Sequence, residues 1–269
     1  MKQFLTLLIS NLCLFSICIA QPLTGCVSGN CENGYGVYIW KSGTIYAGNW
    51  VKGKKHYFGV QIWPSGTAFM GIYKDDERQN RGWFFQADGE RQYLSEKILF
   101  KEQGCVSGNC EAGYGVHISE NGSVYAGFWR DGQKNYFGTQ LWSRGSGFWG
   151  VFKDNERQKR GLYTWPDGES KYDSDAIFFN ESGCVSGNCQ DSVGVYIWKS
   201  GSLYAGIWLD AEKHFFGTQI WENGTSFRGL YSEGNRTGRG QFQWPDGSTE
   251  YNTEEFIYKT TPILSERKE

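Results

Sequence analysis

Residues 36–50 read Gly-Val-Tyr-Ile-Trp-Lys-Ser-Gly-Thr-Ile-Tyr-Ala-Gly-Asn-Trp. A run of β-branched and aromatic residues leads into a Lys-Ser-Gly turn, and a second run of the same kind follows, which is typical of a β-hairpin. In the second run, Tyr46, Gly48 and Trp50 are two residues apart, so they share one face of a strand and the rings can lie across the glycine. The stretch therefore predicts two antiparallel strands with an aromatic face.

The same pattern recurs at intervals of 23 residues, in three groups of three units. The nine units begin at Gly36, Gly59, Gly82, Gly115, Gly138, Gly161, Gly194, Gly217 and Gly240. Such self-similarity indicates a repeat architecture in which each unit is one supersecondary element. The third unit of each group ends early, and the linkers that follow (94–103, 173–182 and 252–259) each contain a short apolar run. We expect these runs to pack over the sheet or to add a strand.

A hexapeptide, Cys-Val-Ser-Gly-Asn-Cys, opens each group, and its copies are 79 residues apart with no insertion or deletion between them. A zinc site needs four ligands, whereas each copy offers two cysteines and no nearby histidine, and neighbouring copies should lie far apart. Each pair most simply closes its own short loop as a disulfide worth about 2 kcal/mol. The predicted disulfide cysteines are Cys26 with Cys31, Cys105 with Cys110, and Cys184 with Cys189.

At the Tyr-x-Gly-x-Trp positions the chain resembles the MORN repeat (membrane occupation and recognition nexus). The resemblance covers nearly all of the chain after residue 25 and implies an all-β fold, an elongated, twisted, single-layer antiparallel meander of successive β-hairpins. At about 4.8 Å per strand, nine uninterrupted hairpins would extend roughly 85 Å. In this family the repeats mediate protein contacts and membrane-lipid association, often beside a separate enzyme domain. Here the repeats occupy almost the whole chain after residue 25 and leave no room for such a domain.

These patterns divide the chain into six segments. They are a signal peptide (1–20), a short N-terminal segment (21–25), repeat blocks 1 (26–104), 2 (105–183) and 3 (184–262), and a polar C-terminal tail (263–269).

The N-terminal segment predicts export. Lys2 precedes an apolar run that ends in a small residue at Ala20, as in a secretory signal peptide. We therefore expect the chain to be secreted, periplasmic or at the cell surface. The alternative is a lipoprotein, because Leu23-Thr-Gly-Cys26 matches the tetrapeptide cut before the acylated cysteine of bacterial lipoproteins. A lipid on Cys26 would leave Cys31 without its partner, and the repeat itself already explains the Gly-Cys pair.

Aromatic residues make up 17% of the chain and supply the candidate sites. One set precedes the hairpin turns and is either structural or an exposed stripe for a peptide, glycan or apolar partner. This candidate binding surface consists of Trp40, Trp63, Trp142, Trp165, Trp198, Trp221 and Trp244. The other set flanks the repeat glycines and is assigned to the repeat core. It consists of Tyr46, Trp50, Phe69, Tyr73, Tyr125, Trp129, Phe148, Phe152, Tyr204, Trp208, Phe227 and Tyr231.

Catalytic chemistry finds little support in the sequence. His56 and His214 occupy one repeat position, but Asn135 stands there in block 2, so we expect exposed turn histidines rather than general bases. The acidic and basic residues at 75–78, 154–157 and 233–236 lack the alternation of a calcium loop and are interpreted as solvated connections. A hydrolase that uses the turn carboxylates Asp88, Asp167 and Asp246 is the enzymatic alternative. Because Asp-Gly turn chemistry accounts for them, we expect no catalytic residue, no metal and no cofactor.

The net charge of −2 and pI of about 6.0 argue against nucleic acid as a partner. The sequence favours a non-enzymatic binding or scaffold protein that contacts a protein partner or ligand through an extended aromatic-rich sheet surface. The alternative is a lipoprotein or a peripheral protein that binds membrane lipid. The open sheet edges would also allow self-association, and no oligomeric state is assigned.

Overall fold

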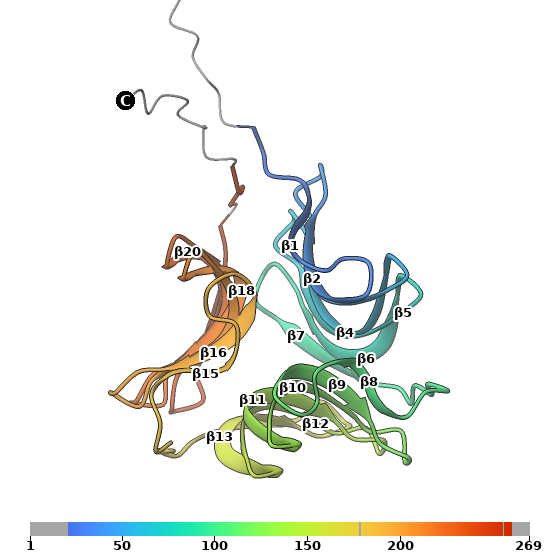
Figure 1. Cartoon of the computed structure of the whole chain (residues 1–269), viewed down its shortest axis with the longest axis vertical. Helices are drawn as coiled ribbons and strands as arrows, with labels where there is room; N and C mark the ends of the chain where they lie inside the picture. The colour runs from blue at the N-terminus through green and yellow to red at the C-terminus, as the bar shows by residue number, and fades with distance from the viewer. Residues whose placement is uncertain (1–20, 178, 255, 260–269) are drawn as a thin grey trace, which may run out of the picture.

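The computed structural model describes residues 21–177, 179–254 and 256–259. The expected signal peptide and the C-terminal tail lie outside these residues. Every helix or strand assigned within the described part is a β-strand, and the strands form three antiparallel sheets of seven strands each (Figure 1).

Each sheet lies almost entirely within one block. Sheet 1 consists of β1 (Gly25–Gly29), β2 (Gly34–Ile39), β3 (Ile45–Val51), β4 (Lys54–Ile62), β5 (Ala68–Lys74), β6 (Glu77–Phe85) and β7 (Arg91–Ser95). Sheet 2 consists of β8 (Gly104–Gly108), β9 (Gly113–Ile118), β10 (Val124–Arg130), β11 (Gln133–Leu141), β12 (Gly147–Lys153), β13 (Glu156–Thr164) and β14 (Ser170–Ser174). Sheet 3 consists of β15 (Gly183–Gly187), β16 (Val193–Ile197), β17 (Leu203–Leu209), β18 (Glu212–Ile220), β19 (Ser226–Ser232), β20 (Asn235–Gln243) and β21 (Thr249–Thr253).

Consecutive strands pair within each sheet, so the predicted meander of hairpins is confirmed. The turn after β2 shows why the sequence folds this way. Trp40 N–H donates to Thr44 O (2.9 Å), Gly43 N–H donates to Trp40 O (2.8 Å), and Gly43 has a φ of 84°, which favours glycine. The same two hydrogen bonds close the turn of all nine repeat units.

The hexapeptide forms a strand of its own, which the sequence did not predict. The three segments are β1, β8 and β15, and each pairs with the following strand to become an edge of its sheet. The three predicted disulfides are confirmed, with Cα–Cα distances of 5.9–6.0 Å. Each disulfide ties the edge strand to the turn that leads into its neighbour.

The blocks are arranged differently from the expected single elongated sheet. The three sheets surround a common centre (Figure 1), and one hydrophobic core contains buried residues from all of them. Val37, Val116 and Val195 occupy one repeat position, and each has 0% of its surface exposed. The reason is that each sheet is apolar on both faces, so one face must be buried against other sheets.

Polar contacts between blocks close this arrangement into a ring. Tyr93 Oη donates to Gly145 O, Tyr172 Oη to Gly224 O, and Tyr251 Oη to Gly66 O, each at 2.8 Å. The three bonds run from block 1 to block 2, from block 2 to block 3, and from block 3 back to block 1. Three equivalent arginines connect the blocks in the same order. Each donates to a backbone carbonyl of the next block: Arg81 to block 2, Arg160 to block 3, and Arg239 to block 1. The molecule is therefore a closed ring of three sheets with approximate threefold symmetry.

The two ends of the described chain meet at the seam between blocks 3 and 1. Leu23 N–H donates to Tyr258 O at 2.8 Å, and Pro22 forms an isolated antiparallel bridge with Lys259. Part of each described apolar run of the linkers packs over the core, whereas Leu99 and Ile257 are exposed, and these runs add no strand to the sheets. The packed linker residues include Ile98, Phe100, Ile177, Phe179 and Phe256.

Equal effects of three equivalent mutations would demonstrate ring closure. We expect Tyr93→Phe, Tyr172→Phe and Tyr251→Phe each to lower the free energy of unfolding by about 1 kcal/mol, because each removes one hydrogen bond between two blocks. Chemical denaturation of the three variants measures this. If the chain were open between blocks 3 and 1, Tyr251→Phe would leave the free energy of unfolding unchanged, while the other two variants would still lower it.

Candidate functional site

Each sheet has a second apolar face, which points away from the shared core. On it, four rings per block form a cluster separate from the central core. These are the twelve repeat-core aromatics, and all are buried, with at most 5% of their surface exposed. We call these three surfaces the outer aromatic faces.

The glycines of the repeat allow the rings to lie flat on the sheet. Gly48 and Gly59 are cross-strand partners on β3 and β4, beneath the ring of Tyr46. A Cβ at Gly59 would lie 2.3 Å from Tyr46 Oη, which is too close for any side chain. Tyr46 Oη donates to Asn49 O at 3.1 Å, and Trp50 Nε1 donates to Gly36 O at 3.1 Å. The Tyr-x-Gly-x-Trp spacing is thus a packing requirement.

The seven tryptophans of the candidate binding surface lie at the hairpin turns that border the outer aromatic faces. None of them is fully buried, and Trp165 is 40% exposed. Trp40 and Trp63 pack against the block 1 cluster, Trp142 against that of block 2, and Trp198 and Trp221 against that of block 3. Each face therefore has a buried floor of rings and a partly exposed tryptophan rim.

Two cations lie over the rings of each face, and neither was predicted from the sequence to belong to it. In block 1, Lys55 Nζ lies 5.3 Å from the ring centroid of Tyr73 and 5.6 Å from that of Trp40. The Arg78 guanidinium lies 5.2 Å from the ring centroid of Phe69. These are cation–π distances. The equivalent cations are Lys134 and Arg157 in block 2 and Lys213 and Arg236 in block 3.

The lysines are held in place by the sheet. Lys55, Lys134 and Lys213 donate to the Oε1 atoms of the equivalent glutamines at 3.0, 2.8 and 3.0 Å. Burial lowers the pKa of each of the three ammonium groups. Their spacing of 79 residues was visible in the sequence and could have identified them. The arginines had been interpreted as part of solvated connections, whereas they cover the rings beside those connections.

A groove of about 780 Å³ opens on the outer aromatic face of block 3. Its walls include Tyr196, Trp198, Lys213 and Gln219, together with the hydroxyls of Ser200 and Ser202. Aromatic surface, a fixed cation and hydrogen-bonding groups therefore meet at one concave place. A concave surface with these groups is typical of binding sites.

The expectation of exposed turn histidines was wrong for His56, which is 8% exposed. Its ring centroid lies 4.5 Å from that of Tyr57 and 5.7 Å from that of Phe100, a linker residue that covers it. His56 Nδ1 accepts a hydrogen bond from Asp75 N–H at 3.2 Å. In block 3, His214 Nδ1 accepts from Glu233 N–H at 3.3 Å. Both rings are structural acceptors.

This role predicts a loss of stability in acid. Burial lowers the pKa of His56 and of His214 in the folded chain, so the unfolded chain binds more protons. The stabilisation is complete above about pH 6.5 and is lost as the pH falls below it. We expect His56→Asn/His214→Asn, which copies Asn135 of block 2, to lose less stability between pH 7 and pH 5 than the wild type. Urea unfolding at both pH values tests this, and identical losses would contradict it.

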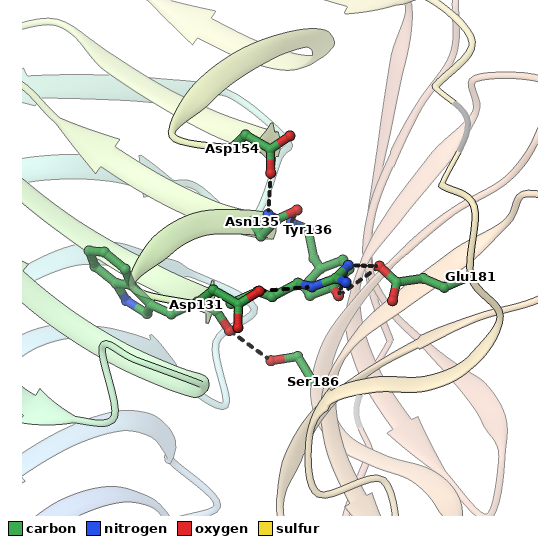
Figure 2. Close-up of polar contacts among 8 residues, drawn as sticks. Asp131, Asn135, Tyr136, Asp154, Glu181 and Ser186 are labelled. Atoms are coloured by element: carbon green, nitrogen blue, oxygen red, sulfur yellow. Dashed lines mark hydrogen bonds and ion pairs between the residues drawn. The ribbon is translucent and has the colours of Figure 1, made fainter.

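A polar cluster holds the linker between blocks 2 and 3 (Figure 2). Glu181 Oε1 accepts from Arg130 Nη1 at 2.6 Å and from Tyr136 Oη at 2.8 Å. Ser186 Oγ, on β15, donates to Trp129 O at 3.4 Å. Burial and the Glu181 carboxylate raise the pKa of Tyr136 to about 12. These contacts fasten the linker to sheet 2.

The three aspartates considered as catalytic residues of a hydrolase instead accept hydrogen bonds from the backbone of their own turns. Asp88, Asp167 and Asp246 each accept through Oδ1 from the backbone N–H two residues later, at 2.8–3.0 Å. Within the described ranges, no three histidine, cysteine, aspartate or glutamate residues are grouped so as to hold a metal ion. No helix in the described part of the chain is long and apolar enough to cross a membrane.

Comparison with known families agrees with this geometry. The family model named MORN repeat matches residues 25–45, 46–68, 125–147, 150–170 and 227–249. The chain contains five MORN repeats. These MORN repeats fall in all three blocks. The matched ranges are offset from the units described above, because residues 46–68, for example, cover β3 and β4 rather than β2 and β3. No curated protein matches the chain.

Similar solved structures give no further information about these MORN repeats. The TCP domain of SAS-4 (dCPAP) of Drosophila melanogaster, in complex with a proline-rich motif of Ana2 (dSTIL), is 9% identical, with 94% of this chain and 99% of that chain covered and a TM-score of 0.17. Virginiamycin B lyase from Staphylococcus aureus is 10% identical, with 88% of each chain covered and a TM-score of 0.15. BamB from Moraxella catarrhalis is 12% identical, with 84% of this chain and 83% of that chain covered and a TM-score of 0.15. TM-scores this low carry no inference.

Proposed function

We propose that this protein is a non-enzymatic binding or scaffold protein that acts outside the cytoplasm and contacts a protein partner through its outer aromatic faces. The observation that carries the proposal is that all three blocks place partly exposed tryptophans at the border of a ring cluster that a fixed cation covers. Tryptophan, tyrosine and arginine contribute the largest share of binding energy in protein interfaces. MORN repeats also mediate protein contacts in the family that the chain resembles.

The disulfides support a location outside the cytoplasm, because such bonds persist in oxidising compartments. They also bear on the lipoprotein alternative. Cys26 Sγ is bonded to Cys31 Sγ, and a lipid on Cys26 would need the same sulfur atom. We therefore favour a freely secreted or envelope-associated protein. Mass spectrometry of the mature N-terminus tests this choice, because a diacylglyceryl group on Cys26 would establish the lipoprotein.

The binding proposal predicts that a rim tryptophan is essential. Trp198 borders the block 3 groove, and its ring centroid lies 5.8 Å from Lys213 Nζ. We expect Trp198→Ala to weaken partner binding by about 2 kcal/mol, roughly 30-fold, while the fold is retained. The experiment identifies partners by cross-linking from the extracellular fraction and then measures Kd for purified pairs.

The matched control is Leu99→Ala, which removes an apolar side chain that is 63% exposed on the linker between blocks 1 and 2. Its Kd should equal that of the wild type. A partner that binds equally well to Trp63→Ala, Trp142→Ala and Trp198→Ala variants would contradict the proposal.

A further inference from the structure

The inner faces of the three sheets differ at one central position. Met70 in block 1 and Trp149 in block 2 are replaced in block 3 by Arg228, which is 7% exposed. Block 3 therefore places a cation in a core that the other two blocks fill with apolar side chains. An isolated charge of this kind is expensive to bury without a counter-charge.

Arg228 is surrounded by neutral groups from blocks 1, 2 and 3. Its guanidinium lies 4.7 Å from the ring centroid of Phe85 and 4.4 Å from that of Trp149. Nη2 donates to Gln241 Oε1 at 2.5 Å, and Nη1 lies 3.7 Å from Met70 Sδ. Two rings, an amide and a thioether stabilise a cation only in part, because none of them carries a negative charge.

The charged groups near Arg228 have the same sign. Arg91 repels it electrostatically, and Nη1 of Arg91 is itself buried with no hydrogen-bond partner. Burial, followed by Arg91, lowers the pKa of Arg228 to about 9, so the side chain stays charged at neutral pH. Among the described residues, no carboxylate contributes to this pKa. Within the described part of the chain, Arg228 and Arg91 therefore place two positive charges close together with no carboxylate among the groups that shift the pKa of Arg228.

A cavity of about 30 Å³ adjoins the guanidinium. Its lining combines Arg228, Arg239, Gln241 and Tyr251 with apolar residues, and no aspartate or glutamate is among them. A cavity needs about 10–15 Å³ to hold one water-sized particle. The space is therefore large enough for a small anion such as chloride.

We propose that this cavity binds a single monatomic anion of the halide class, with chloride as the natural ligand, held by Arg228 at the centre of the ring. The anion supplies the counter-charge that the described side chains lack. Because Arg228 contacts Phe85 and Met70 of block 1 and Trp149 of block 2, the bound anion stabilises the closed ring. The proposal does not depend on the partner-binding function.

Thermal unfolding in different salts at constant ionic strength tests the proposal. Chloride or bromide should raise the Tm saturably relative to sodium sulfate, by roughly 3–6 °C at about ten times Kd. Arg228→Met, which copies block 1, should abolish the difference between the salts. Arg144→Met removes an exposed arginine and should leave the difference intact. Equal Tm values of the wild type in chloride and in sulfate, or an unchanged halide effect in Arg228→Met, would overturn the proposal.

A second measurement covers the case in which Arg228→Met does not fold. Crystals of the wild-type protein grown with sodium bromide should show an anomalous peak in the cavity, in contact with the guanidinium. A cavity without bromide signal would refute the site whatever the behaviour of the variant.

Discussion

Replacing Trp83 with alanine should lower the free energy of unfolding by about 3–5 kcal/mol, among the largest effects of any single substitution in this chain. Trp83 lies on β6 in block 1 and is 1% exposed. Its Nε1 donates to Thr164 Oγ1 in block 2 at 3.0 Å. The substitution therefore opens a cavity between two blocks and removes a donor from a buried hydroxyl. Guanidinium unfolding followed by circular dichroism measures the loss.

Trp165→Ala is the matched control, because the same residue type is 40% exposed there. Its effect should stay within about 0.5 kcal/mol. Similar losses in the two variants would show that Trp83 is not at an interface between blocks.

Arg81→Met should cost about 3 kcal/mol, because the guanidinium hydrogen-bonds several carbonyls at the end of block 1 and in block 2. Nη1 donates to Gly145 O at 2.8 Å and to Ser95 O at 3.0 Å, and Nη2 donates to Trp142 O and Ser146 O. Methionine retains much of the apolar stem but removes all four of these hydrogen bonds, three of which run to carbonyls of block 2. Urea unfolding gives the difference.

Lys41→Met removes a cation from an exposed turn and should be close to neutral. If Arg81→Met were equally neutral, the contacts between blocks 1 and 2 would not hold the ring together.

The local features of this fold could be predicted from the sequence because they depend on neighbouring residues. The turn at Gly43 needs a positive φ, and the pairing of Cys26 with Cys31 needs only a short loop. Both are determined within a few residues. The floor of rings followed similarly from the two-residue spacing of Tyr46, Gly48 and Trp50.

Ring closure could not be predicted in the same way. The bond from Tyr251 to Gly66 joins residues 185 positions apart, and no local pattern encodes such a contact. A signal was nevertheless present, because apolar residues occupy both faces of β2: Val37 and Ile39 on one, Tyr38 on the other. A strand that is apolar on both faces indicates burial on both sides, and a single exposed layer does not provide it.

The candidate site could also be predicted only in part from the sequence. The tryptophan rim was found from its repetition. Lys55 was not assigned to the site, and Arg78 was missed because the charged residues at 75–78 were interpreted as a solvated connection. His56 was misplaced because the residue that covers it, Phe100, belongs to a linker 44 positions away. In both cases the environment is created by a different segment of the chain.

The central claim is that three sheets close around one core, which leaves their outer aromatic faces free to bind. Small-angle X-ray scattering of the purified monomer tests it most directly. The closed ring predicts a radius of gyration of about 18 Å, as for a compact domain of this length. A single sheet of roughly 85 Å would give roughly 25 Å and an elongated distance distribution, and that result would contradict the account.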